Sequence, residues 1–174
     1  MTAPAAVTDV FTLLDDMRLI KDAHELATMR RAAQVSTTAH RRAMRATAPG
    51  RNEYEIEAEL LHEFRRHGAQ APAYTSIVAG GANACVLHYV QNDALLNAGE
   101  LLLIDAGCEL DGYASDITRT FPISGKFGAA QRDVYQLVLA AQAAGLAAVA
   151  PGAAWIAPHD AAVRVLAQGM IDFG

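Results

Sequence analysis

The chain has 174 residues, a size typical of a single domain of roughly 100 to 200 residues. Its 14 Lys and Arg are outnumbered by 19 Asp and Glu, so the net charge of −5 disfavours nucleic-acid binding. Two cysteines cannot make a disulfide framework and lack zinc-binding spacing, and no signal peptide is evident, so we expect a cytoplasmic protein. We expect no membrane span, because no run reaches about 18 apolar residues.

Helical patterns occupy the first part of the chain. Residues 1–20 predict a tether or junction followed by a helical segment, because apolar side chains recur there at helical spacing. The stretch from Asp22 to Thr47 contains neither Gly nor Pro and predicts an amphipathic helix. A second helix should begin after Asn52, which can form a capping box with Glu55, and should end at Gly68.

The pattern changes to that of strands after this second helix. Short segments rich in apolar and β-branched residues, separated by Gly, Asn and Asp, predict strands over residues 76–79, 85–90, 101–106 and 114–121. Helical spacing returns over residues 128–149 and 159–170. This order predicts an α+β fold with a mainly antiparallel sheet and helices covering one face.

A hairpin is predicted over residues 104–121, because Asp111-Gly112 is a typical turn pair between two strands. Two registers fit this segment. In one register Asp105 lies directly opposite Asp116, and in the other Asp105 opposes Thr118 while Asp116 lies diagonally. Side chains alternate along a strand with period two, so the two carboxylates project from the same face in either register.

Two neighbouring carboxylates repel each other unless one is protonated or a cation lies between them. Asp105 also follows the apolar segment Leu101 to Ile104, where an unpaired charge is costly. A divalent metal ion would resolve the conflict. The alternative is that one aspartate caps a turn while the other pairs with an arginine such as Arg119. The residues alone leave both interpretations open.

Histidine and cysteine residues are further candidates for chemistry. His88 lies in the apolar sequence VLHYV, where a histidine needs a partner or a task, although a buried histidine with satisfied hydrogen bonds is the default. His24 and His40 lie in a polar helix and are expected to be solvated. Cys85 and Cys108 lack a defensible nucleophilic arrangement and are interpreted as small buried residues.

A family resemblance rests on six runs: MRLIKDAHELATMRRAA, APGRNEYEIEAELLHEFRRHGA, AYTSIV, LHYVQND, GELLLIDAGCELDGYASDITRTFPISGKF and QRDVYQLVL. Together they resemble the catalytic domain of the Xaa-Pro aminopeptidases (aminopeptidase P) and related prolidases. The resemblance implies a partial pita-bread fold, an antiparallel sheet covered by helices. On this basis residues 1–20 are the N-terminal tether or junction, and residues 21–174 are roughly the first half of the catalytic domain.

The resemblance also implies an activity and a site. Complete members use two metal ions, usually Mn²⁺, to hydrolyse the bond between an N-terminal residue and a following proline. Matched residue by residue, Asp105 and Asp116 correspond to two metal ligands and His88 to a catalytic histidine near the scissile bond. Tyr74 resembles a substrate-binding tyrosine in the pocket of the family.

The chain departs from the family pattern after the hairpin. Complete members carry one more histidine ligand and two glutamate ligands, and nothing in residues 151–174 replaces them. We therefore expect the chain alone to be inactive as a peptidase, and possession of a bound metal stays open. Its uncovered apolar face should associate with the missing C-terminal half or with a second copy as a homodimer. The alternative is a non-catalytic pita-bread module for binding or assembly.

Overall fold

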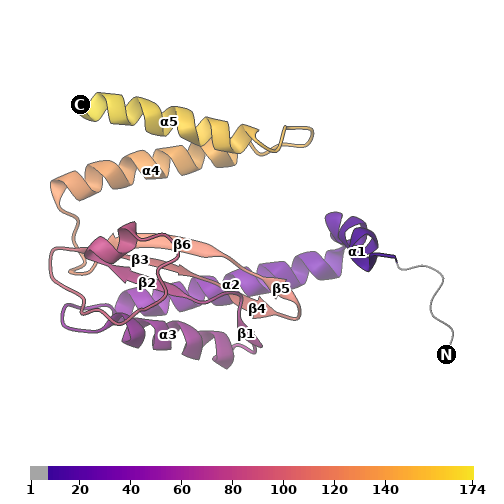
Figure 1. Cartoon of the computed structure of the whole chain (residues 1–174), viewed down its shortest axis with the longest axis horizontal. Coiled ribbons are helices and arrows are strands. Elements are labelled where there is room, and N and C mark those ends of the chain that lie inside the picture. The colour runs from indigo at the N-terminus through magenta and orange to yellow at the C-terminus, as the bar shows by residue number, and fades with distance from the viewer. Residues whose placement is uncertain (1–7) are drawn as a thin grey trace. The chain divides into compact units, whose positions relative to one another are not determined.

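The computed structural model describes residues 8–174, which divide into two compact units that are described separately (Figure 1). One unit ends at Ser124, and the other runs from Gly125 to Gly174. The helical segment predicted near the N-terminus is α1, Val10–Leu19, and none of its residues is buried. The beginning of the predicted tether, residues 1–7, lies outside the described part of the chain.

Two longer helices follow in the first unit: α2, Ala23–Ala46, and α3, Glu53–Arg66. At the start of α2, Asp22 Oδ1 accepts the Glu25 N–H at 2.8 Å, and Glu25 Oε2 accepts the Asp22 N–H at 2.7 Å. At the start of α3, Glu55 Oε2 accepts the Asn52 N–H at 2.7 Å. These contacts pair backbone groups that helix ends leave free, so both helices start as predicted.

The strands form two small antiparallel sheets. Their bounds are β1, Ala71–Pro72; β2, Ile77–Gly80; β3, Leu101–Ala106; β4, Cys108–Leu110; β5, Tyr113–Ala114; and β6, Ile117–Pro122. One sheet has the order β2-β3-β6, and the other has the order β1-β4-β5. The predicted α+β fold with antiparallel pairing is confirmed.

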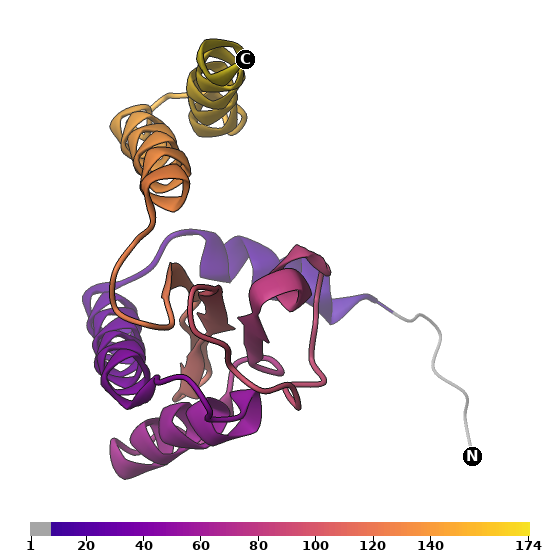
Figure 2. The same cartoon turned by 90° about the vertical axis from the view of Figure 1, so that its left-hand side faces the viewer.

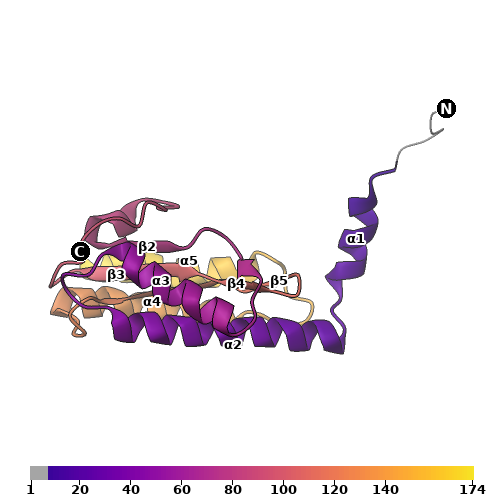
Figure 3. The same cartoon turned by 90° about the horizontal axis from the view of Figure 1, so that it is seen from below.

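The two faces of β3 have different surroundings. Leu102, Ile104 and Ala106 are fully buried and belong to the same core as residues of α2 and α3. Asp105 projects from the opposite face and is half-buried. Figure 2 shows α2 and the short helix after β2 on opposite sides of the strands, and Figure 3 shows α3 lying across them. The long helices α2 and α3 therefore cover the face of the sheet that carries the core residues, and Asp105 lies on the other face.

The strand predicted over residues 85–90 is wrong. The chain forms a 3-10 helix there, η1, Gly81–Cys85, followed by a turn in which His88 has a φ of 55°. Leu87 is 86% exposed, whereas Tyr89 is only 8% exposed. The apolar residues of this segment therefore do not form a buried strand face, because Tyr89 alone among residues 85–90 is buried.

The second unit is a pair of helices that agrees with the two helices predicted for this region: α4, Ala129–Ala147, and α5, Ala157–Phe173. A Cβ added at Gly169 would lie 2.3 Å from Leu137 Cδ1, so the glycine allows the two helices to approach closely. Trp155, in the connection between them, is 98% exposed. Between residues 8 and 174, no helix has the combined length and hydropathy needed to cross a bilayer.

His40 is buried in α2, and this corrects the prediction of a solvated side chain. Its Nε2 lies 3.0 Å from the carbonyl oxygen of Ala106 at the end of β3, where the neutral ring donates a hydrogen bond. Its Nδ1 has no hydrogen-bond partner among the described residues. Burial lowers the pKa of His40 below its ordinary value, and the hydrogen bond to Ala106 opposes this shift only in part.

The burial of His40 predicts that acid weakens the fold. The unfolded chain binds a proton at this ring near pH 6.5, about the ordinary value, but the folded chain binds it only at lower pH. Stability is therefore lost as the pH falls below about 6.5, by at most about 1.4 kcal/mol per pH unit. Urea unfolding between about pH 7.5 and pH 5.5 should show a smaller loss in His40→Gln than in the wild type.

The control for this measurement is His24→Gln, which removes an exposed histidine from the same helix. This variant should keep the pH dependence of the wild type. An equal loss of stability in His40→Gln and the wild type would contradict the assignment of the effect to His40.

Candidate metal centre

The hairpin adopts the second of the two registers that the sequence allows. Leu110 pairs with Tyr113 across the turn, and Asp105 pairs with Thr118. Asp116 therefore lies diagonally from Asp105 on the neighbouring strand segment. The two carboxylates project from the same face, as the alternation of side chains predicts.

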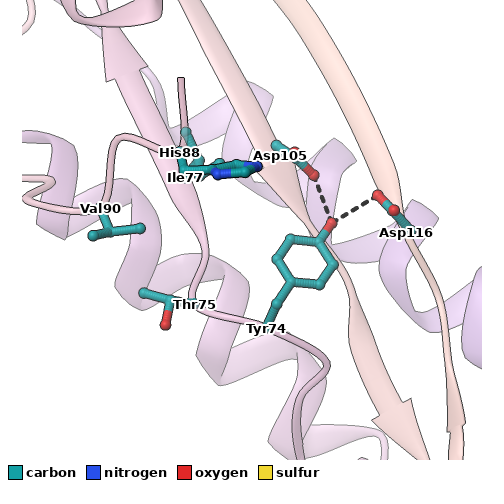
Figure 4. A pocket seen from close by; sticks show the side chains of 7 residues that line it. All are labelled: Tyr74, Thr75, Ile77, His88, Val90, Asp105 and Asp116. Atoms are coloured by element: carbon teal, nitrogen blue, oxygen red, sulfur yellow. Dashed lines mark hydrogen bonds between the residues drawn. The ribbon is translucent and has the colours of Figure 1, made fainter. Parts of the chain in front are cut away.

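Both carboxylates meet at the hydroxyl of Tyr74, as Figure 4 shows. This hydroxyl lies 2.6 Å from Asp105 Oδ1 and 2.9 Å from Asp116 Oδ1. A phenol has one proton and can donate it fully to only one acceptor at a time. The pKa of Tyr74 is raised well above its ordinary value, first by burial and then by the hydrogen bonds to Asp105 and Asp116, so the proton stays on the phenol.

The close approach of the two arms of this hairpin depends on Gly107. An added Cβ at this position would lie 1.6 Å from the carbonyl oxygen of Ser115, closer than any non-bonded contact allows. The Ser115 N–H donates to the carbonyl oxygen of Cys108 at 2.9 Å, and its hydroxyl lies 2.7 Å from that of Ser36 in α2. Ser115, the residue before Asp116, is thus fixed to the other arm of the hairpin and to a core helix.

A pocket of about 370 Å³ opens over the two carboxylates, lined by Tyr74, Thr75, Ile77, His88, Val90, Asp105 and Asp116. The structure brings together all four residues that the sequence singled out for the site. His88 enters from the loop after η1, and Figure 4 shows its imidazole turned toward the side of the pocket that holds Asp105. His88 is exposed, so the default expectation of a buried histidine is wrong.

Three lining residues were missed by the sequence analysis: Thr75, Ile77 and Val90. Ile77 pairs directly with Asp105 across β2 and β3, so knowledge of this strand pairing would have placed it on the same face. No feature of the sequence singles out Thr75 or Val90.

Other candidate residues do not join the site. Arg119 donates to the carbonyl oxygen of Thr118 at 2.7 Å and forms no salt bridge to either aspartate within the described residues. The interpretation in which an arginine pairs with one of the carboxylates therefore loses its support.

The two cysteines differ from each other. Cys85 is exposed, which corrects the expectation that both cysteines are buried, whereas Cys108 is buried as expected.

The donor set fits a divalent cation. Two carboxylates that face one point and share a single proton donor leave lone pairs unpaired, and hard divalent ions prefer such oxygen ligands. In the part of the chain from residue 8 to 174, no group of three or more His, Cys, Asp or Glu side chains is close enough to hold a metal ion. The two carboxylates are oxygen donors of the type that such an ion prefers, but they are fewer than the ligands it usually draws.

Comparison with known proteins identifies the family. Residues 27–174, most of the chain, match metallopeptidase family M24. The chain belongs to this family. A Haemophilus influenzae Xaa-Pro aminopeptidase is 50% identical to this M24 chain over 168 residues, which cover 97% of the chain and 39% of that protein.

Solved structures show the same relationship for this M24 chain. Proline aminopeptidase P II from Yersinia pestis superposes with a TM-score of 0.95 at 51% identity, over 99% of the chain and 39% of that structure. A zinc-substituted Escherichia coli aminopeptidase P in complex with product gives a TM-score of 0.95 at 45% identity, with the same coverage. The fold is therefore a partial pita-bread fold, and the chain spans about two fifths of the length of these relatives.

Proposed function

We propose that this chain supplies part of the active site of a metal-dependent Xaa-Pro aminopeptidase. The observation that carries the proposal is the convergence of Asp105 and Asp116 on one hydroxyl, with His88 lining the same pocket. The substrate would be a peptide with proline in the second position, as the names of the relatives indicate for those proteins. Membership of a metallopeptidase family supports the need for a metal ion.

Each residue has a distinct role in this proposal. Asp105 and Asp116 would hold divalent metal, two Mn²⁺ ions in a complete site, and bound metal would lower the pKa of water and stabilise a developing oxyanion. His88 would donate a hydrogen bond, or move a proton, near the scissile bond. Tyr74 would orient both carboxylates through its hydroxyl while its ring forms one wall of the substrate pocket.

The proposed site needs further ligands, because divalent ions in proteins draw four to six or more donors and the described residues bring two carboxylates together. We therefore expect no hydrolysis of an Ala-Pro peptide by the purified 174-residue chain, even with added Mn²⁺. Release of alanine from such a peptide, increasing with the Mn²⁺ concentration and absent in Asp116→Asn, would contradict this expectation. Weak Mn²⁺ binding without hydrolysis is the expected result.

A non-catalytic role in binding or assembly is the second candidate. It is favoured by large apolar side chains that are exposed in the second unit, such as Val138, Leu146 and Trp155. In either case we propose a cytoplasmic protein in which these side chains contact the remainder of a pita-bread domain or a second copy of the chain. Light scattering distinguishes a homodimer from a monomer.

A further inference from the structure

The carboxylate of Glu53, at the start of α3, is completely buried. Its Oε1 accepts hydrogen bonds from the Gly80 N–H at 2.7 Å and from Asn83 Nδ2 at 3.1 Å. Its Oε2 accepts from the Tyr89 hydroxyl at 2.7 Å and from the Ala94 N–H at 3.0 Å. None of these donors is a cation, so the charge of Glu53 is compensated by dipoles alone.

The four donors come from both ends and from the middle of residues 80–94. Glu53 therefore binds this segment at four places: at the end of β2, in η1, at the residue after His88, and near the point where the segment returns toward β3. The Glu53 N–H also donates to the carbonyl oxygen of Ala94 at 3.0 Å, so backbone and side chain of one residue bind the same end of the loop. A helix N-terminus also favours a negative charge at this place.

The residues around His88 are exposed apart from Tyr89. Leu87, on one side, is 86% exposed, and Val90, beyond Tyr89, is 45% exposed. Tyr89 is the one buried residue among these neighbours, and its hydroxyl donates to Glu53. The backbone at His88 has a φ of 55°, a conformation unfavourable for a non-glycine residue unless adjacent contacts enforce it.

We propose that Glu53, acting through Tyr89, is a positioning residue that fixes the imidazole of His88 in the pocket. The consequence for catalysis rests on the function proposed above, but the placement of His88 does not. Burial and the hydrogen bond to Glu53 raise the pKa of Tyr89 to about 12, which keeps its hydroxyl protonated as a donor.

A carboxylate is required at this position because both of its oxygens accept two hydrogen bonds. Glutamine has one acceptor oxygen and an amide nitrogen that can only donate. In either orientation of a glutamine, its NH₂ group would face the N–H of Gly80 or of Ala94. Glu53→Gln therefore keeps the shape of the side chain and disrupts the network, and Tyr89→Phe removes one hydroxyl only.

The test is a two-dimensional NMR spectrum of the chain with ¹³C-labelled histidine rings. We expect the His88 ring signals to shift or broaden in Glu53→Gln and in Tyr89→Phe, while the signals of His40 in the core stay in place. Glu57→Gln, one helical turn further along α3, is the matched control and should leave His88 unchanged. Mn²⁺ binding at the two aspartates should be the same in all these proteins.

Unchanged His88 signals in both variants would overturn the proposal. Circular dichroism establishes which variants fold, and Tyr89→Phe decides the question if Glu53→Gln does not fold. Unfolding of Tyr89→Phe as well would also overturn it, since the contact would then serve the fold and not the placement of His88. Failure of the peptidase function changes none of these signals, so the two proposals fail separately.

Discussion

Replacing Asp105 with asparagine is expected to weaken Mn²⁺ binding by this chain by at least about 10-fold, because loss of an outer-shell partner alone costs that much in known sites. The substitution keeps the shape of the side chain and removes its charge. Asp116→Asn should have a similar effect, because the two carboxylates converge on one point. Isothermal titration calorimetry of Mn²⁺ into each variant measures the affinity directly.

The comparison needs two further proteins. Asp133→Asn removes an exposed carboxylate from α4 and should bind Mn²⁺ as the wild type does. Tyr74→Phe keeps both aspartates but removes the hydroxyl between them, so a smaller loss is expected. Equal affinities of Asp105→Asn and the wild type would show that the bound metal does not use the carboxylate pair.

Gly107→Ala is expected to destabilise the chain by about 3 kcal/mol or more, at the upper end of overpacking effects. The added methyl group would lie 1.6 Å from the Ser115 carbonyl oxygen, so the two arms of the hairpin must move apart. The neighbouring residue in β3 is Ala106, which accepts the hydrogen bond of the buried His40, and this limits how far that arm can move. Urea unfolding followed by circular dichroism measures the change in the free energy of unfolding.

The same substitution should also reduce Mn²⁺ affinity, although both aspartates remain, because they lie on opposite arms of the hairpin. Gly128→Ala is the control, since an added Cβ there meets only the side chain of Gln131 at 3.4 Å. Loss of the preferred N-cap glycine and the lower entropy of the unfolded chain oppose each other, so it should change the free energy of unfolding by less than about 1 kcal/mol. A Gly107→Ala protein as stable as this control would be inconsistent with the packing described for Gly107 and Ser115.

The hairpin and the common face of its carboxylates could be predicted because they depend on local rules. Strand alternation fixes the face, and the Asp-Gly pair fixes the turn. The register was also accessible in principle. Asp111 and Gly112 have φ values of 50° and 80°, the positive values of a two-residue turn that such a pair favours, and this turn pairs Leu110 with Tyr113.

The predictions that failed depend on contacts between distant parts of the sequence. The segment of His88 has the composition of a strand, but Glu53, from a different element, binds its backbone and side chains in another conformation. His40 has polar neighbours along the helix, but Ala106 offers it a carbonyl oxygen in the core. Composition and periodicity carry no information about such partners.

The register of the hairpin limits which changes of sequence this protein can accept during evolution. Removing one residue between Asp105 and Asp116 would move Asp116 to the face that packs on the helices, because successive side chains point to opposite faces. Both aspartates would still be encoded, but their carboxylates would no longer project from the same face. Substitutions at other positions of the hairpin keep the two carboxylates on one face, whereas insertion or deletion of an odd number of residues between them does not.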